Sequence, residues 1–342
     1  MIHQSQLQRT IFGRSVRQGA CCEQETKGGV WVKHTGLLAL LLAAAIAVTA
    51  AGCKDKGGKE EPQGTVSSSA PEPVDRNFPV SIGEIRIPER PERIVSLSPA
   101  LTEVLCELGA ESRLAGVSDF CDYPQSVEGL DRCGSASLPN FEAIAALSPD
   151  VVFTSAPLAQ ADAVRLQQMG AEVVVLGRAD SLEALSEVYE TAATILDGME
   201  DGAENGQTVF GGLRAGYDAL KARADNLSEP LGGILLREPP LLMATGDTFE
   251  GELLEWIGVE NDAAEFTGWV YPSDKAVDLY PDLIFYDQSI DPSYFQSTPV
   301  YSTTGAFQNG RLYPVDMTAF ERQSGRMLDE LTHMFESAYP EG

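Results

Sequence analysis

A sequence segment that occurs twice limits the fold of this chain more than any other feature of its sequence. Residues 147–153 recur as residues 279–285, an offset of 132, with the same order of Leu, Pro, Asp and an apolar run. A second match, at an offset of 149, relates residues 103–111 to residues 252–260. A helix, Pro-Asp and a strand form a common junction, so either match alone would say little. Two matches in the same order indicate a duplicated unit and hence two similar lobes.

Short apolar runs recur at the spacing of an α/β fold. They are residues 94–97, 114–117, 151–153 and 173–176 in the first half, and 234–236, 241–244, 283–286 and 312–315 in the second. Helical stretches between several of the runs favour a parallel sheet. After the first run, Ser98 and Pro99 provide an N-cap and a proline at the first helical position, and Gly109 ends the helix.

Two helical patterns lie between the halves. Residues 180–199 carry an apolar stripe, and Val209, Leu213, Tyr217 and Leu220 continue at helical spacing. We expect the second pattern to be one long helix that bridges the lobes. Its glycines, Gly211, Gly212 and Gly216, work against that continuity, because each costs about 1 kcal/mol relative to Ala in a helix interior.

The N-terminal region predicts export. Residues 36–52 carry no charge and follow Lys33, which is typical of a signal peptide. A transmembrane anchor is the alternative, although these 17 residues are at the short end of what spans a bilayer. Residues 50–53 (Ala-Ala-Gly-Cys) resemble a bacterial lipobox, which predicts cleavage before Cys53 and a lipid on that cysteine. Residues 1–29 are long enough to indicate a start codon assigned too early, with Val30 as the alternative start.

Composition excludes some classes of function. With 51 acidic and 24 basic residues the formal net charge is -27, and we find no basic patch that would offset it at a phosphate backbone, so a nucleic acid partner is excluded. The apolar share of 43% excludes global disorder. Residues 54–78 are rich in Lys, Gly, Glu, Pro and Ser and predict a flexible tether.

Several motifs resemble the cobalamin and iron-chelate binding proteins of ABC importers, with vitamin B12-binding members the most similar. The motifs occur in the family's order, at residues 93–103 (RIVSLSPALTE), 116–124 (GVSDFCDYP), 140–150 (NFEAIAALSPD) and 320–326 (FERQSGR). The resemblance covers residues 91–339. It implies an α/β fold of two Rossmann-like lobes joined by a rigid helix, with the ligand in the cleft between them.

The resemblance also implies a function and a domain plan. It predicts a non-enzymatic lipoprotein that captures a corrinoid and delivers it to a permease dimer with its ATPase, held by lipid at the outer face of the cytoplasmic membrane, without a resident cofactor. A ferric siderophore or haem is the alternative cargo, and an extracytoplasmic enzyme or metallochaperone the alternative class. The expected parts are a signal peptide (1–52), a lipid-anchored linker (53–78), an N-terminal lobe (79–180), an inter-lobe helical segment (181–228) and a C-terminal lobe (229–342).

Two sets of site residues follow from matching the family's positions. The expected ligand-binding residues are Phe120, Tyr123, Ser155, Met243, Trp269, Tyr271, Phe320 and Arg322. Residues Ala136, Ser155 and Thr318 depart from the pattern of the vitamin B12-binding members, which leaves the iron-chelate alternative open. The expected permease contacts are Glu142 and Asp274, and these are also 132 residues apart, the offset that the internal repeat has by itself. The alternative is that Glu142 and Asp274 are ordinary solvent-exposed acids with no role in docking.

Metal and catalytic chemistry have little support in the sequence. After residue 52 the chain keeps one histidine, His333, so we expect no multi-histidine metal site and no Ser-His-Asp triad. A haem held by Tyr271 or Tyr123 stays open. In the implied fold, Cys121 and Cys133 lie on loops at the same cleft edge, which predicts a disulfide in an oxidising compartment. Cys106 is then a free thiol, and a bridge to Cys106 is the rival pairing.

Overall fold

The computed structural model of the protein describes residues 77–340. The predicted signal peptide, the lipid attachment at Cys53 and nearly all of the predicted linker lie outside these residues. A short hairpin, β1 (Val80–Ile82) and β2 (Ile85–Ile87), opens the described part. No helix within residues 77–340 is both long enough and apolar enough to span a bilayer.

The first lobe is built on a parallel sheet of five strands. Their spatial order is β5 (Asp131–Arg132), β4 (Leu114–Val117), β3 (Ile94–Ser96), β8 (Val151–Thr154) and β9 (Glu172–Val175). The helices of this lobe are α1 (Pro99–Glu107), α2 (Phe141–Leu147) and α3 (Gln160–Gln168). A hairpin of β6 (Gly134–Ser135) and β7 (Leu138–Pro139) precedes α2. The apolar runs found in the sequence form four of the strands.

The start and end of α1 confirm the predicted capping. Ser98 accepts a hydrogen bond from the backbone N–H of Leu101, and Pro99 is the first helical residue. Gly109 follows the helix with a φ of 82°, a left-handed conformation that glycine adopts without strain. The helix therefore begins directly after the carboxyl end of β3 and ends before Gly109.

The second lobe repeats the strand order of the first. Strands β12 (Val259–Asn261), β10 (Leu231–Glu238), β13 (Leu283–Asp287) and β14 (Leu312–Val315) are parallel neighbours in that order, matching β4, β3, β8 and β9. Helix α6 (Phe249–Trp256) matches α1, and the 3-10 helix η3 (Ser273–Asp278) matches α2. The antiparallel strand β11 (Leu242–Met243) is an addition between β10 and α6. This addition is one reason why the two repeat offsets differ.

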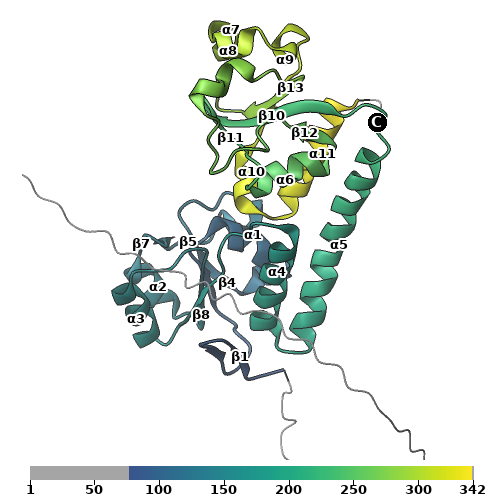
Figure 1. Ribbon diagram of the computed structural model, residues 1–342. Helices are drawn as coiled ribbons and strands as arrows, with labels where there is room; N and C mark the ends of the chain where they lie inside the picture. Colours follow the sequence, from purple (N-terminus) through teal and green to yellow (C-terminus); the bar gives the residue numbers. More distant parts are fainter. Residues whose placement is uncertain (1–76, 341–342) are drawn as a thin grey trace, which may run out of the picture. The chain divides into compact units, whose positions relative to one another are not determined.

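Two long helices connect the sheets. Helices α4 (Leu182–Asp197) and α5 (Asp201–Ala224) lie side by side, and α5 extends from the first lobe to the second (Figure 1). Its side near the first lobe meets α1, where Asn205 donates to the carbonyl of Leu108, and its other end accepts a hydrogen bond from Trp256 of α6 at the carbonyl of Tyr217. The predicted bridging helix is therefore continuous in spite of its glycines.

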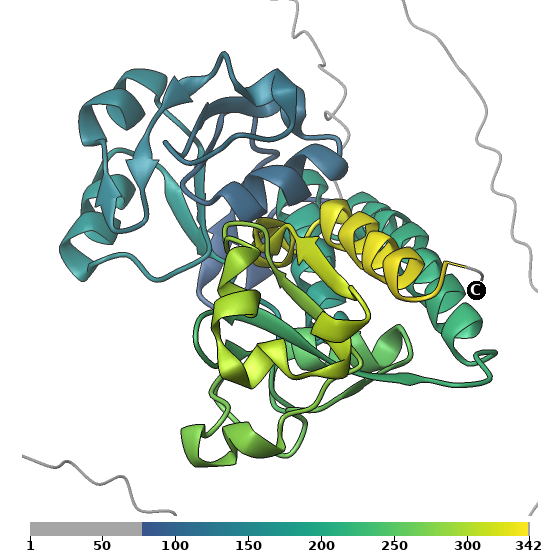
Figure 2. The ribbon, with the colours of Figure 1, turned by 90° about the horizontal axis from the view of Figure 1, so that it is seen from above.

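The chain ends with helices that return to the junction of the two sheets. Small helices α7 (Ser293–Ser297), α8 (Pro299–Ser302) and α9 (Gly305–Gln308) lie between β13 and β14. Helices α10 (Met317–Arg322) and α11 (Gly325–Ala338) follow β14, and α11 runs beside α5 (Figure 2). The largest buried cluster includes residues of both lobes, among them Leu105, Leu235 and Phe285, so one apolar core joins them.

Candidate ligand site between the lobes

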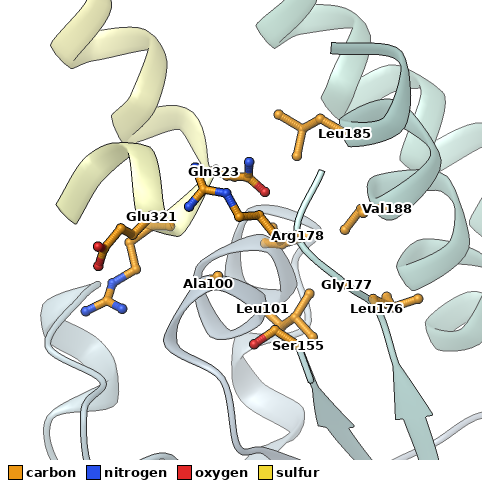
Figure 3. A pocket seen from close by; sticks show the side chains of 12 residues that line it. Ala100, Leu101, Ser155, Leu176, Gly177, Arg178, Leu185, Val188, Glu321 and Gln323 are labelled. Carbon is orange, nitrogen blue, oxygen red and sulfur yellow. The ribbon is translucent and has the colours of Figure 1, made fainter. Parts of the chain in front are cut away.

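A cavity of about 180 Å³ lies where the two lobes meet, and we call it the inter-lobe pocket. It is bounded by the start of α1, the ends of β8 and β9, helix α4 and the end of α10. Its lining residues are Ala100, Leu101, Val104, Ser155, Leu176, Gly177, Arg178, Leu185, Val188, Glu321, Arg322 and Gln323. Figure 3 shows Leu185 and Val188 on the α4 side and Glu321 on the α10 side. This is the position at the carboxyl ends of parallel strands where α/β folds bind ligands.

A buried carboxylate from α1 organises the polar wall of the site. Glu103 is 1% exposed, accepts a hydrogen bond of 2.6 Å from Ser324 Oγ and one of 3.0 Å from Arg326, and lies 3.7 Å from Arg322 Nε. Burial raises the pKa of Glu103, against the lowering effect of Ser324 and the two arginines. Because α1 belongs to the first lobe and residues 322–326 follow the second sheet, this network joins the lobes.

Two further contacts fix the same junction. Glu107, one turn after Glu103, accepts hydrogen bonds from Tyr189 of α4 and from the backbone N–H of Gly325 at 2.8 Å. Gln323 has a left-handed φ of 52° that turns the chain from α10 into α11. Its amide donates to the carbonyl of Ala179 at 2.7 Å and accepts from the N–H of Ala179 at 2.8 Å. The segment after β9 is thereby held against the second lobe.

The arginines around the inter-lobe pocket each lie near a carboxylate, although Arg322 Nε is buried without a hydrogen-bond partner within residues 77–340. Arg178 pairs with Glu250, and Arg237 with Glu321 at 2.6 Å. Arg322 lies 3.7 Å from both Glu103 and Asp122, and Arg326 lies 3.0 Å from Glu103 and 3.3 Å from Asp316. The site is therefore rich in hydrogen-bond donors, but its positive charges are locally balanced.

Aromatic side chains from both lobes flank this charged junction. Tyr123, 46% exposed, lies under the Arg326 guanidinium at 4.9 Å from the ring centre, and its neighbour Phe120 is 67% exposed. Trp269 of the second lobe is half-buried, with the Arg237 guanidinium 5.4 Å from its ring. The predicted residues Phe120, Tyr123 and Trp269 thus present accessible faces around the site, while Ser155 and Arg322 line the inter-lobe pocket.

Three of the expected ligand-binding residues are part of the core instead. Met243 and Phe320 are fully buried and Tyr271 is 5% exposed. Met243 and Tyr271 pack in the core of the second lobe, and Phe320 packs in the cluster that joins the lobes. The structure therefore offers no accessible surface on these three side chains for a ligand, and their expected role stays a prediction. Tyr271, the residue that would hold a haem in the alternative interpretation, is among these buried side chains.

The predicted Cys121–Cys133 disulfide is also wrong in this structure. All three cysteines within residues 77–340, Cys106 included, are free. Cys121 lies 3.2 Å from Thr102 Oγ1 and belongs to the core cluster that contains Leu101 and Val104, whereas Cys133 belongs to a separate cluster with Val95 and Val152. The physical reason is that the two thiols lie on opposite faces of the first sheet. Burial raises the pKa of Cys133 to about 11 and that of Cys106 to about 12, which disfavours the thiolate form of both near neutral pH.

The expected permease contacts occupy equivalent positions. Glu142 is in the first turn of α2 and Asp274 in the first turn of η3, and both are exposed. His333 is exposed on α11. Within residues 77–340 no group of three or more His, Cys, Asp or Glu side chains is arranged to hold a metal ion.

Sequence reasoning missed much of the inter-lobe pocket. Arg178 and Gln323 line the pocket, and Glu103 accepts hydrogen bonds from Ser324 and Arg326 beside it. None of these three was among the expected site residues. Glu103 and residues 322–326 do lie within two of the four motifs that carry the family resemblance, at residues 93–103 and 320–326, and the joint occurrence of these two motifs was the available signal. Arg178 follows β9 without any motif, so nothing in the sequence marked it.

Comparisons with known proteins agree with this geometry. The family model for periplasmic binding proteins matches residues 94–318. An uncharacterised ABC transporter substrate-binding lipoprotein of Bacillus subtilis is 29% identical over 90% of this chain and 98% of its own length. A vitamin B12-binding protein of Vibrio vulnificus is 23% identical over 69% of this chain and 86% of its own. The crystal structure of a periplasmic haem-binding protein of Vibrio cholerae superposes with a TM-score of 0.64 at 23% identity, covering 72% of this chain and 99% of that one.

Proposed function

The chain belongs to the periplasmic binding protein family, and from that premise we propose that it is the lipoprotein component of an ABC importer that captures a corrinoid. It is an extracytoplasmic substrate-binding component of an ABC transporter rather than an enzyme. The corrinoid, the lipid anchor and the permease-docking residues are the parts that we propose.

The balance of charges at the site is the observation on which we choose between the possible ligands. Ferric siderophores and haem bring carboxylates or other anionic groups, which arginines without a partner would attract. Here Arg178, Arg237, Arg322 and Arg326 already face Glu250, Glu321, Glu103, Asp122 and Asp316. A corrin ring surrounded by neutral amide side chains needs donors and acceptors more than net positive charge. The balanced pairs therefore favour a corrinoid over an anionic chelate.

The aromatic residues support the same cargo. A broad, flat ligand gains most from aromatic faces, and Tyr123 and Trp269 offer one from each lobe. The inter-lobe pocket, at about 180 Å³, is smaller than the roughly 300–1,000 Å³ of pockets that enclose a drug-sized ligand. We therefore place the ring across the pocket, with a side arm directed toward Ser155 and Arg178.

Binding spectra and thermal shift test the cargo. The purified protein is titrated with cyanocobalamin, cobinamide, haemin and a ferric siderophore. We expect the corrinoids to raise the midpoint of unfolding, because a ligand at 100 times its Kd adds about 2.7 kcal/mol. Trp269→Ala is expected to weaken corrinoid binding, and Tyr280→Ala, which removes an exposed ring outside the site, serves as its control. Tighter binding of haemin or the siderophore would replace the corrinoid, and turnover of any ligand would favour an enzyme.

Delivery of the ligand to the permease requires a docking surface, which would include two exposed acids. We propose that Glu142 and Asp274 face basic side chains of the permease dimer. A variant with Glu142→Lys and Asp274→Lys is expected to abolish uptake while leaving ligand affinity unchanged. Reduced affinity for the ligand would show that these acids are not on a docking surface.

The proposed membrane attachment depends on Cys53. We propose that cleavage exposes this cysteine for lipid modification, as the lipobox resemblance implies. Cys53→Ser is then expected to shift the protein from the membrane fraction to the soluble fraction and to remove a lipid mass from its N-terminal peptide. An unchanged distribution between the fractions would argue for a membrane-spanning anchor.

A further inference from the structure

The two lobes present the same pair of side chains in front of their equivalent helices. Asn140 caps α2 and Pro272 precedes η3 in the same place. Two residues before each cap stands an exposed aliphatic residue: Leu138 is 78% exposed and Val270 is 53% exposed. Leu138 and Val270 are 132 residues apart, as Glu142 and Asp274 are. We call Leu138 with Glu142, and Val270 with Asp274, the apolar–acidic pairs.

Both aliphatic residues are held by backbone pairing. Leu138 pairs with Ser135 in the β6–β7 hairpin, and Val270 forms an antiparallel bridge with Leu242. Each side chain therefore stands on an ordered, extended segment and still faces water. An exposed apolar side chain on an ordered segment gains free energy when a partner covers it.

Repetition distinguishes these two residues from other exposed apolar side chains. Val277 is 88% exposed and Tyr280 is 62% exposed, but their equivalents in the first lobe are Ala145 and Ser148. Neither Val277 nor Tyr280 is therefore part of a repeated surface. Only a feature present in both lobes can make the same contact with two copies of one subunit.

We propose that Leu138 and Val270 are the apolar contacts through which the two lobes dock on the two subunits of the permease dimer. This inference rests on the proposed function and extends it beyond the carboxylates. The exposed acids Glu142 and Asp274 select a basic partner, but exposed ion pairs contribute little in water and are weakened by salt. Burial of Leu138 and Val270 supplies the part of the docking energy that salt does not remove.

Photocrosslinking in cells tests the contact directly. Leu138, Val270 and, as a control, Met199 are replaced one at a time by p-benzoylphenylalanine in the full chain. Met199 is 51% exposed but lies at the turn between α4 and α5. We expect positions 138 and 270 to form adducts that mass spectrometry identifies as the membrane-spanning subunit of an ABC importer, and position 199 to form none. No adduct, an adduct with a second copy of this chain, or the same adduct from position 199 would overturn the proposal.

Polar substitutions measure how much the apolar contact contributes. The test variant combines Leu138→Gln with Val270→Thr, and the control variant combines Met199→Gln with Val175→Thr. Both carry the photoreactive residue in place of Ala145, an exposed position of α2. We expect the first combination to lower the yield of the permease adduct by about tenfold or more, and the control combination to leave it unchanged. Equal yields would overturn the apolar role.

The same variants separate this inference from the cargo assignment. Permease adducts form or fail to form whatever the cargo is, and cyanocobalamin binding is measured on each purified variant. Intact corrinoid binding without adducts contradicts the docking inference alone. Adducts without corrinoid binding contradict the cargo alone.

Discussion

Asp262 shows how one side chain sets a pH dependence. Its Oδ2 atom is buried without a hydrogen-bond partner in residues 77–340, and burial together with the nearby charges of Asp282 and Glu260 raises its pKa to about 6. A carboxyl whose pKa is higher in the folded state contributes stability below its unfolded pKa, and that contribution is lost as the pH rises through the folded pKa. We therefore expect Asp262→Asn to stabilise the protein at pH 7.5 but not at pH 4.

Thermal unfolding at several pH values checks the expectation for Asp262. Because the side chain is partly exposed to solvent, we expect a gain of only about 1 kcal/mol at pH 7.5, or roughly 2–4 °C in the unfolding midpoint. Glu265→Gln removes a neighbouring exposed acid and is expected to change the midpoint little. A gain from Asp262→Asn that persists undiminished at pH 4 would show that titration of this group is not its cause.

The cysteines give a second prediction at the residue scale. Because Cys121 and Cys133 pack on opposite faces of the first sheet, we expect both to be reduced in protein purified from its native compartment. Alkylation under denaturing conditions without a reductant, followed by peptide mapping, checks this. We expect both cysteines to be alkylated in the unreduced sample, and a linked peptide pair would contradict the structure.

Helix α5 shows how packing overrides propensity at the scale of an element. Its early glycines allow close approach to α4, since a Cβ on Gly202 would lie 2.3 Å from the carbonyl oxygen of Ala193. A Cβ on Gly211 would meet no atom within 4 Å. We expect Gly211→Ala to stabilise the protein by roughly 0.5–1 kcal/mol and Gly202→Ala to destabilise it by roughly 2 kcal/mol or more. Denaturant unfolding measures both, and stabilisation by Gly202→Ala would mean that α4 and α5 are not so closely packed.

Most elements could be predicted from the sequence because their signals are local. The apolar runs and the Ser98-Pro99 start of α1 depend on neighbours in the chain, and the repeat is visible when the sequence is compared with itself. The structure confirms all three. The composition of the site depends on contacts between distant residues. Glu103 meets Ser324 and Arg326 more than 200 positions away, and the burial of Met243 depends on the added strand β11. Such contacts leave no periodic signal in a single sequence.

The buried junction between the lobes has a consequence for the whole molecule. The core cluster is continuous across both lobes. At the same junction, Glu103 and Glu107 of α1 accept hydrogen bonds from Ser324, Gly325 and Arg326. Opening the junction would expose apolar surface and leave buried charges without partners, which costs several kcal/mol. Each lobe is therefore stabilised by the other, and we expect the described part of the chain to unfold in one cooperative transition.

The positions of the tryptophans allow that cooperativity to be measured. After residue 52, the tryptophans are Trp256 and Trp269, both in the second lobe, so their fluorescence reports on that lobe, whereas far-ultraviolet circular dichroism reports on both. We expect the two unfolding curves to coincide. Glu103→Ala, which leaves Arg326 without its closest carboxylate, is expected to lower both midpoints together, by roughly 3 kcal/mol in unfolding free energy. Curves that separate in the unsubstituted protein would show that the lobes are independent, and the junction would then be free to open around its ligand.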